Sequence, residues 1–175
     1  FLEKRKGILD GICITGGEPT FHPDLRDLLY DIKNMGYLVK LDTNGYDPMQ
    51  LDHLFKEELV DYVAMDIKNS QEKYAKTSGC PDLDLTRIKL SVDLIRDSGL
   101  DYEFRTTVVK ELHSIDDMYS IARWLEGANA YYLQSYVPSE DIIMPVFSSY
   151  SKNELMAIRA LMQEYIPHIF LRGLD

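Results

Sequence analysis

The segment GICITGGEPT, residues 11–20, joins a short apolar run to a double glycine and a proline. A run of this kind that ends in a glycine cluster is typical of a buried strand followed by a turn. Beyond the turn, leucine and isoleucine recur at helical spacing as far as Gly36. Residues 11–36 therefore predict one βα unit: a strand over 11–15, the turn, and an amphipathic helix that ends at the glycine.

The same alternation of apolar runs and amphipathic stretches continues to the end of the chain. Helix starts are indicated by Asp47-Pro48, by Ser114 and by the capping-box spacing of Ser151 and Glu154. Strands alternating with helices predict a parallel sheet. We expect its further strands over residues 38–43, 62–67, 102–109, 130–136 and 168–171.

The two faces of these strands favour one parallel fold over two others. An open doubly wound sheet needs apolar side chains on both faces, and a closed eight-stranded barrel fills its interior with branched apolar ones. Here one face is apolar and the other is polar on nearly every strand. We therefore predict a partial (βα)6 barrel with a polar interior, in one domain over residues 1–175, and a site at the carboxyl ends of the strands. The polar face carries Cys13, Thr15, Lys40, Asp42, Asp66, Lys68, Glu103, Arg105, Thr107 and Gln134.

Composition excludes several classes of function. The 175 residues carry a formal net charge of -10, which disfavours binding to a nucleic acid polymer. No apolar run approaches the roughly 20 residues that span a membrane, so we expect a cytoplasmic protein without membrane association. The two cysteines, Cys13 and Cys80, match no metal-ligand spacing and are expected to be reduced thiols. Because a strand follows so soon after Phe1, we expect the natural protein to begin further upstream.

Three strand ends concentrate the candidate chemistry. Gly16 and Gly17 would let backbone groups approach a ligand, although the same pair also fits a plain turn. Neither a P-loop nor a G-x-G-x-x-G fingerprint is present. Asp42 and Asp66 would be neighbours on adjacent strands, so a cation, a ligand amine or Lys68 is expected between them, unless both are solvated loop acids.

Taken together, four segments resemble a known family. Thr-Gly-Gly-Glu-Pro at 15–19, Leu-Asp-Thr-Asn-Gly at 41–45, Met-Asp-Ile-Lys at 65–68 and Phe-Arg-Thr-Thr-Val-Val at 104–109 resemble the radical S-adenosylmethionine (SAM) activases of glycyl-radical enzymes. Among these, the resemblance is strongest to activators of anaerobic ribonucleoside-triphosphate reductase. It implies a TIM-like partial barrel of six βα units, of which this chain would lack the first strand and the cluster loop.

The resemblance also implies roles for individual residues. Gly16, Gly17, Glu18 and Pro19 match the segment that binds the SAM amino group, through backbone and the glutamate. Asp42 and Thr43 match residues near the methionyl carboxylate, and together with Asp66 they match a monovalent-cation site. The remaining matches are Lys68 and Arg105, which would hold the SAM carboxylate or ribose, and Gln134, which would lie near the adenosine.

The family also holds a four-iron four-sulfur cluster on a C-x-x-x-C-x-x-C loop, which this sequence lacks. The resemblance implies that the full-length protein cleaves SAM to a 5'-deoxyadenosyl radical, which abstracts hydrogen from a glycine of a partner reductase or lyase. Flavodoxin or ferredoxin would donate the electron. We expect the chain as given to be inactive, because Cys13 and Cys80 cannot replace the cluster loop.

Three alternatives remain open from the sequence. The first is a radical SAM enzyme acting on a small molecule, of the deazaguanine synthase kind. The second is a non-catalytic SAM- or nucleoside-binding module. The third is a cluster-free hydrolase or aldolase that uses Asp42, Asp66 and Lys68. Outside these residues, His113 precedes a helix and is expected to have a surface or capping role.

Overall fold

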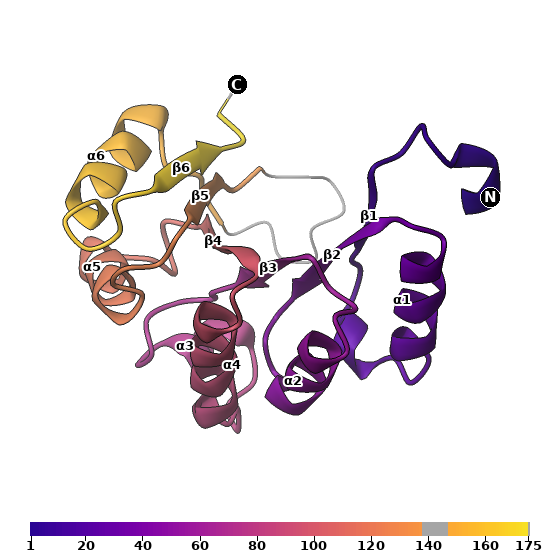
Figure 1. Cartoon of the computed structure of the whole chain (residues 1–175). Helices are drawn as coiled ribbons and strands as arrows, with labels where there is room; N and C mark the ends of the chain where they lie inside the picture. The colour runs from indigo at the N-terminus through magenta and orange to yellow at the C-terminus, as the bar shows by residue number, and fades with distance from the viewer. Residues whose placement is uncertain (138–146, 175) are drawn as a thin grey trace. The chain divides into compact units, whose positions relative to one another are not determined.

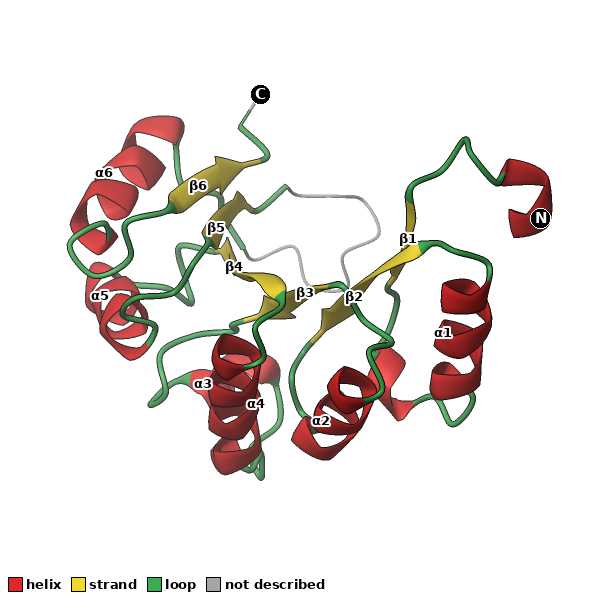
Figure 2. Cartoon of the chain, viewed as in Figure 1, coloured by secondary structure: helices red, strands yellow, loops and turns green. Residues whose placement is uncertain are grey.

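The computed structural model describes residues 1–137 and 147–174. Six strands alternate with helices, and their order in the sheet is the order of the chain, β1-β2-β3-β4-β5-β6 (Figure 1). The predicted α/β alternation is confirmed, as Figure 2 shows by colour. None of the helices in the described residues has the length and apolar character needed to cross a bilayer. The chain divides into two compact units, residues 1–66 with 86–102, and residues 67–85 with 103 onward.

The first unit contains three parallel strands. The register pairs Ile12 with Val39 and Leu41 with Val63, so like faces of the three strands coincide. Helix α1 contacts β2. The elements of this unit are η1 (Leu2–Arg5), β1 (Gly11–Ile14), η2 (Pro19–Phe21), α1 (Leu25–Asn34), β2 (Leu38–Thr43), α2 (Pro48–Lys56), β3 (Tyr62–Asp66) and, from its second residue, α4 (Leu85–Asp97).

Burial in the first unit follows the predicted alternation. Val39, Leu41 and Val63 are fully buried, whereas Cys13 is exposed and Asp42 is half-buried. The apolar face is therefore the core face, whereas Cys13 and Asp42 on the polar face remain at least partly exposed.

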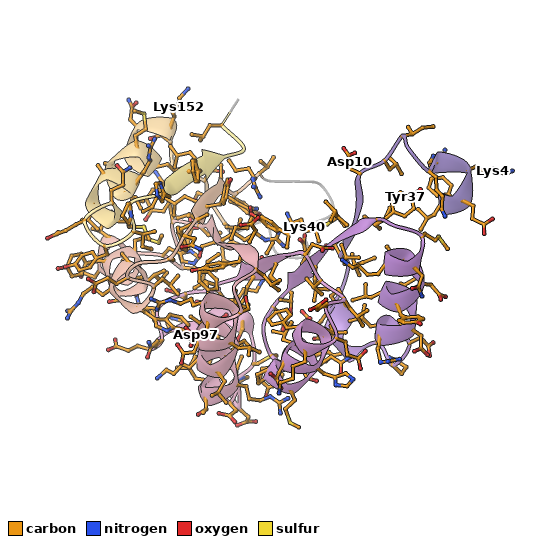
Figure 3. The ribbon with its side chains drawn as sticks, in the orientation of Figure 1. Lys4, Asp10, Tyr37, Lys40, Asp97 and Lys152 are labelled. Atoms are coloured by element: carbon orange, nitrogen blue, oxygen red, sulfur yellow. The ribbon has the colours of Figure 1, made fainter. Side chains whose placement is uncertain are left out.

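Two polar contacts fix the ends of elements in this unit. The side chain of Asp47 accepts a hydrogen bond from Gln50 N at 3.2 Å, which confirms the predicted start of α2. Tyr37 Oη donates to the carbonyl oxygen of Leu2 at 2.7 Å and so attaches η1 to the start of β2 (Figure 3).

The second unit contains three further parallel strands. Phe104, Leu133 and Ile169 form part of its buried core. The register places Arg105 opposite Tyr132, and Thr107 opposite Gln134. Its elements are α3 (Tyr74–Ser78), β4 (Asp101–Val108, which begins in the first unit), α5 (Ile115–Trp124), β5 (Tyr131–Ser135), α6 (Lys152–Met162) and β6 (Ile169–Arg172).

Capping boxes start the last two helices. The Ser114 and Asp117 side chains exchange hydrogen bonds with each other's backbone N–H groups, and Ser151 with Glu154 repeats the pattern. Both predicted helix starts are confirmed.

Candidate functional site

The turn after β1 exposes its backbone. Gly16 and Gly17 have φ of +97° and +56°, a left-handed conformation that side chains disfavour. A Cβ added at either glycine would meet no atom within 4 Å, so the conformation, not crowding, requires glycine here. The predicted turn is therefore present, with open space on the side where a side chain would stand, and its contact with a ligand stays a prediction.

Glu18 fastens this turn to its surroundings. Its Oε1 accepts from Thr20 Oγ1 at 2.6 Å and from Thr43 Oγ1 at 2.7 Å, with Thr20 N at 3.2 Å. Its Oε2 accepts from the backbone N–H of Asn44 at 2.6 Å. The carboxylate thus joins the turn after β1 to the segment that ends β2, although the two are about 25 residues apart in sequence.

Thr43 is buried and its hydroxyl is fully engaged. An ionised carboxylate only accepts hydrogen bonds, so the Thr43 hydroxyl proton points to Glu18. The same oxygen accepts from Gly45 N at 3.0 Å, and the carbonyl of Gly45 accepts from buried Ser91 Oγ at 2.6 Å. Three hydrogen bonds consequently hold the loop after β2: Thr43 to Glu18, Gly45 N to Thr43, and Ser91 to the carbonyl of Gly45.

Asp42 lies on the polar face of β2 beside a cation and a thiol. Its Oδ1 is 3.7 Å from Lys40 Nζ and 3.7 Å from Cys13 Sγ. The register places Ala64 opposite Asp42, so Asp66 lies two residues further along the same face of β3. No group of three or more His, Cys, Asp or Glu suited to a metal occurs in the described part of the chain. An Asp42/Asp66 cation site stays a prediction.

The other three predicted site residues belong to the second unit. Ile67 N donates to the carbonyl of Arg105 at 2.8 Å, so Lys68 directly follows a residue bonded to β4. Gln134 is opposite Thr107 in the sheet. Its Oε1 is shielded from water and has no hydrogen-bond partner among residues 1–137 and 147–174. A buried acceptor of this kind is suited to a ligand N–H or O–H group.

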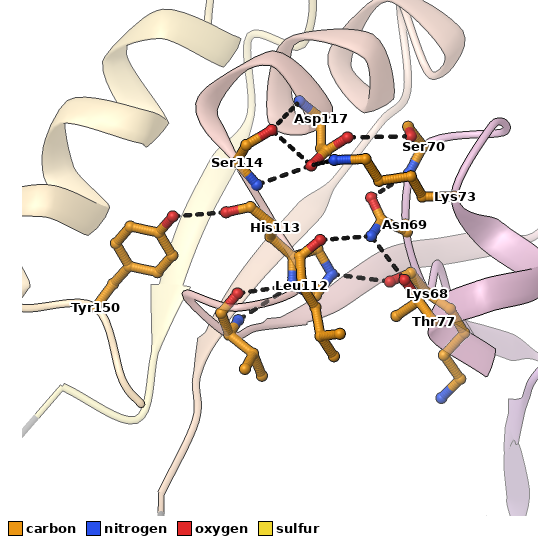
Figure 4. A network of polar contacts seen from close by, with 11 residues as sticks. Lys68, Asn69, Ser70, Lys73, Thr77, Leu112, His113, Ser114, Asp117 and Tyr150 are labelled. Atoms are coloured by element: carbon orange, nitrogen blue, oxygen red, sulfur yellow. Dashed lines mark hydrogen bonds and ion pairs between the residues drawn. The ribbon is translucent and has the colours of Figure 1, made fainter. Parts of the chain in front are cut away.

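His113 corrects the sequence prediction of a surface role, because only 2% of it is exposed. Nδ1 accepts from Val109 N at 3.1 Å, which places the proton on Nε2, and Nε2 donates to the carbonyl of Lys68 at 2.8 Å (Figure 4). Burial lowers the pKa of His113 from 6.5, and its backbone hydrogen bonds oppose that shift only in part. The imidazole is therefore a neutral support for the backbone at Lys68.

A polar network extends this support. Buried Asn69 donates through Nδ2 to Thr77 Oγ1 at 2.7 Å and to the carbonyl of Leu112 at 2.9 Å (Figure 4). Asp117 pairs with Lys73 at 2.7 Å. Together with His113, these contacts tie the segment after β3 to the loop between β4 and α5. Local sequence did not indicate this network, because the bonds of Asn69 to Leu112, of Lys73 to Asp117 and of His113 to Lys68 join residues 43 to 45 positions apart.

Glu103 and Arg172 form a pair that the site prediction also missed. Glu103 is 2% exposed, and its two carboxylate oxygens accept from the Arg172 guanidinium at 3.1 and 3.3 Å. The guanidinium also lies 4.0 Å from the ring centroid of Tyr132, which stacks on Phe170 at 5.0 Å. This pair explains how a glutamate is accommodated on the polar face of β4.

Comparisons with known proteins identify the family of the chain. Residues 1–125 match the radical SAM superfamily. A Methanocaldococcus jannaschii protein provisionally named as a glycyl-radical enzyme activating enzyme is 31% identical over 173 residues, which cover 95% of this chain and 72% of that relative. A 7-carboxy-7-deazaguanine synthase from Neisseria meningitidis is 44% identical over 55 residues, covering 30% of this chain and 26% of its own length.

The fold also matches a solved structure. A domain of pyruvate-formate lyase-activating enzyme from Bacteroides vulgatus superposes with a TM-score of 0.72. The superposition covers 93% of this chain and 99% of that domain at 17% identity, so it bears on the fold alone. The predicted partial-barrel class is confirmed by this match.

Proposed function

The chain belongs to the radical SAM superfamily, and on that premise we propose that it is the SAM-binding part of an activase that generates a glycyl radical on a partner enzyme. One observation carries the proposal: the similarity to a relative named as an activating enzyme extends over 95% of this chain. Within this proposal, the partner is an anaerobic ribonucleoside-triphosphate reductase or a related enzyme, and flavodoxin or ferredoxin donates the electron.

Features of both units support SAM as the ligand. The open backbone of Gly16 and Gly17 suits the methionyl amino group, which needs carbonyl acceptors. The buried Oε1 of Gln134 suits a donor such as an adenine or ribose group. Pro19, Asp42, Asp66, Lys68 and Arg105 complete the proposed set. When bound, SAM supplies the adenosyl group with which enzymes of this superfamily begin radical chemistry.

The residues present do not fit a four-iron four-sulfur cluster. The sequence contains two cysteines, and Cys13 lies within β1. Both cysteines are exposed, and neither takes part in a disulfide. Cluster binding needs at least three thiolates in the family pattern, so this chain contributes the binding and orientation of SAM, and we expect it to be inactive by itself.

The decisive experiment uses the full-length gene product, reconstituted anaerobically with iron and sulfide, and the candidate reductase. Electron spin resonance after addition of SAM and reductant should show a glycyl radical on the reductase. A reductase whose target glycine is replaced by alanine is the matched control and should give no signal. Absence of the radical with the intact reductase and other candidate partners would overturn the activase proposal.

A second candidate function is a radical SAM enzyme that acts on a small molecule. The 44% identity to a deazaguanine synthase favours it over a limited stretch. Product analysis with purine-related substrates would separate it from an activase.

A non-catalytic SAM-binding module makes a different prediction. The isolated 175-residue chain should then bind SAM at micromolar concentration without a cluster. Calorimetry that detects binding only in the cluster-bearing form would exclude this module.

A further inference from the structure

We infer that two buried side chains, Thr106 and His113, are positioning residues that fix the direction in which the Lys68 side chain leaves the backbone. This inference rests on the proposed function, in which Lys68 holds the carboxylate or ribose of SAM. Neither Thr106 nor His113 belongs to the set of site residues predicted from the sequence. Both act on SAM through Lys68 and not by contact with the ligand.

The peptide group before Lys68 is held by two buried hydroxyls. Thr106 Oγ1, on β4, lies 2.7 Å from the carbonyl oxygen of Ile67, which can only accept, so the threonine donates its single proton there. Tyr131 Oη, on β5, lies 2.5 Å from the same Oγ1 and is therefore the donor of that second bond. Burial raises the pKa of Tyr131, which keeps the phenol protonated for this role. Tyr131 thus orients the hydroxyl that holds Ile67.

The peptide group after Lys68 is held by His113. Nε2 of the imidazole donates to the carbonyl oxygen of Lys68 at 2.8 Å, and Nδ1 accepts from Val109 N at 3.1 Å. Tyr150 Oη donates to the carbonyl oxygen of His113 at 2.5 Å and attaches the same residue a third time. The ring that supports Lys68 is therefore itself fixed on the loop after β4.

The two anchored peptide groups determine where the Lys68 side chain starts. Peptide groups are planar, so the groups on either side of a residue set its φ and ψ, and with them the direction of its Cα–Cβ bond. For Lys68, each of these groups accepts from a residue that is only 2% exposed. From this fixed point, the Lys68 side chain extends away from His113 (Figure 4).

A fixed starting point matters because lysine is flexible. Its ammonium is carried on a four-carbon stem, which loses rotamer freedom when it binds an anionic or polar ligand group. A backbone that is already ordered adds nothing to this entropic cost, whereas a mobile backbone adds to it. Thr106 and His113 therefore raise the affinity of Lys68 for its ligand without touching that ligand.

A double-mutant cycle with Lys68 distinguishes positioning from a general loss of structure. SAM binding is measured by calorimetry on the cluster-bearing full-length protein. Thr106→Val keeps the shape of the side chain but removes its hydroxyl, and should weaken SAM binding about tenfold. In the Lys68→Met background, the same change should alter the affinity by less than about twofold, because the residue that it positions is gone. Thr106→Ser, the conservative variant, restores the hydroxyl and should bind SAM within about threefold of wild type.

Two replacements of His113 separate its side-chain hydrogen bonds. Glutamine carries its amide Nε2 at the same number of bonds from Cβ as the imidazole Nε2, so His113→Gln keeps a donor for the Lys68 carbonyl but has no acceptor in the place of Nδ1. Leucine has neither. His113→Leu should therefore weaken SAM binding about tenfold, and His113→Gln by less than about threefold. If Thr106→Val or His113→Leu does not fold, the other variant carries the cycle with Lys68→Met.

Two results of the cycle overturn the inference. If Thr106→Val weakens SAM binding by the same factor with and without Lys68, its effect is structural damage and the positioning role is wrong. If Lys68→Met leaves the SAM affinity unchanged, Lys68 does not hold SAM and its position has no bearing on binding.

A measurement without ligand separates this inference from the proposed function. Amide hydrogen exchange over residues 67–70 should accelerate at least about tenfold in Thr106→Val and stay close to wild type in Thr106→Ser. Unchanged exchange in Thr106→Val means that the hydroxyl does not hold this backbone, and the inference is then wrong. Failure of the wild-type protein to bind SAM would refute the proposed function, and the exchange result would still decide whether Thr106 holds the backbone at Lys68.

Discussion

Replacing His113 with leucine removes two hydrogen bonds from the interior of the second unit. The change leaves Val109 N–H and the carbonyl of Lys68 without the imidazole that contacts them at 3.1 and 2.8 Å (Figure 4). Each buried polar group that loses its partner costs about 1–3 kcal/mol, so the variant should lose about 2–6 kcal/mol of unfolding free energy. Leucine fills the space that the ring leaves, which limits any further cost from a cavity.

The same residue predicts how stability depends on pH. Burial lowers the pKa of His113 below 6.5 in the folded state, so the unfolded chain takes up this proton more readily. The stability that depends on the neutral ring is complete above about pH 6.5 and is lost as the pH falls from there toward the lower folded pKa. The protonated ring cannot accept from Val109 N–H, which is the physical reason for the loss.

Urea unfolding, followed by circular dichroism, measures both effects. Wild type should be less stable near about pH 5.5 than near about pH 8, and His113→Leu should lack that part of the difference. His168→Gln changes an exposed histidine and should alter stability by no more than about 0.5 kcal/mol. If His113→Leu retains both the stability and the pH dependence of wild type, the supporting role of His113 is refuted.

Three further changes test other parts of the structure. Gly16→Ala places a side chain at φ +97° and should cost about 1–2 kcal/mol in thermal unfolding, together with a loss of SAM affinity. Burial raises the pKa of Asp117, but its hydrogen bonds, first that to Lys73, bring the pKa below 3.8 overall. The stability that results is present above about pH 3.8 and is lost as the pH falls through the folded pKa. Asp117→Asn should lack this loss in an acid unfolding titration. Arg172→Met removes the two contacts with buried Glu103 and should cost about 1–3 kcal/mol in urea unfolding, whereas Arg172→Lys, which keeps the charge but not the fork, should be intermediate.

Local sequence was sufficient to predict the fold. Alternation over residues 38–43 predicted β2 at its observed bounds, because Val39 and Leu41 face the core while Lys40 and Asp42 do not. Helix starts could also be predicted from the sequence, since a capping box is a contact between residues three positions apart. The bounds of the other strands shifted by one residue at one or both ends, as strand ends depend on pairing with neighbours.

The strand ends that carry the candidate site residues could be predicted, whereas the contacts of those residues could not, and their ligand roles stay predictions. Gly16 and Gly17 indicated an exposed backbone, and both glycines are exposed in the structure. The sequence could not show that the proton of Thr43 is donated to Glu18, because that bond depends on how two strands align. His113 was mispredicted for the same reason: its Nε2 bonds the carbonyl of Lys68, 45 residues earlier, and local sequence does not show that contact.

The order of the strands bears on how the polypeptide acquires its structure during synthesis. In the pairings β1–β2, β2–β3, β4–β5 and β5–β6, each new strand adds beside the strand that precedes it in the chain. The partner of each added strand has therefore already left the ribosome, and only the stretch of chain between two consecutive strands must close. Assembly can thus advance from the amino end, one strand and one helix at a time, without waiting for a distant segment.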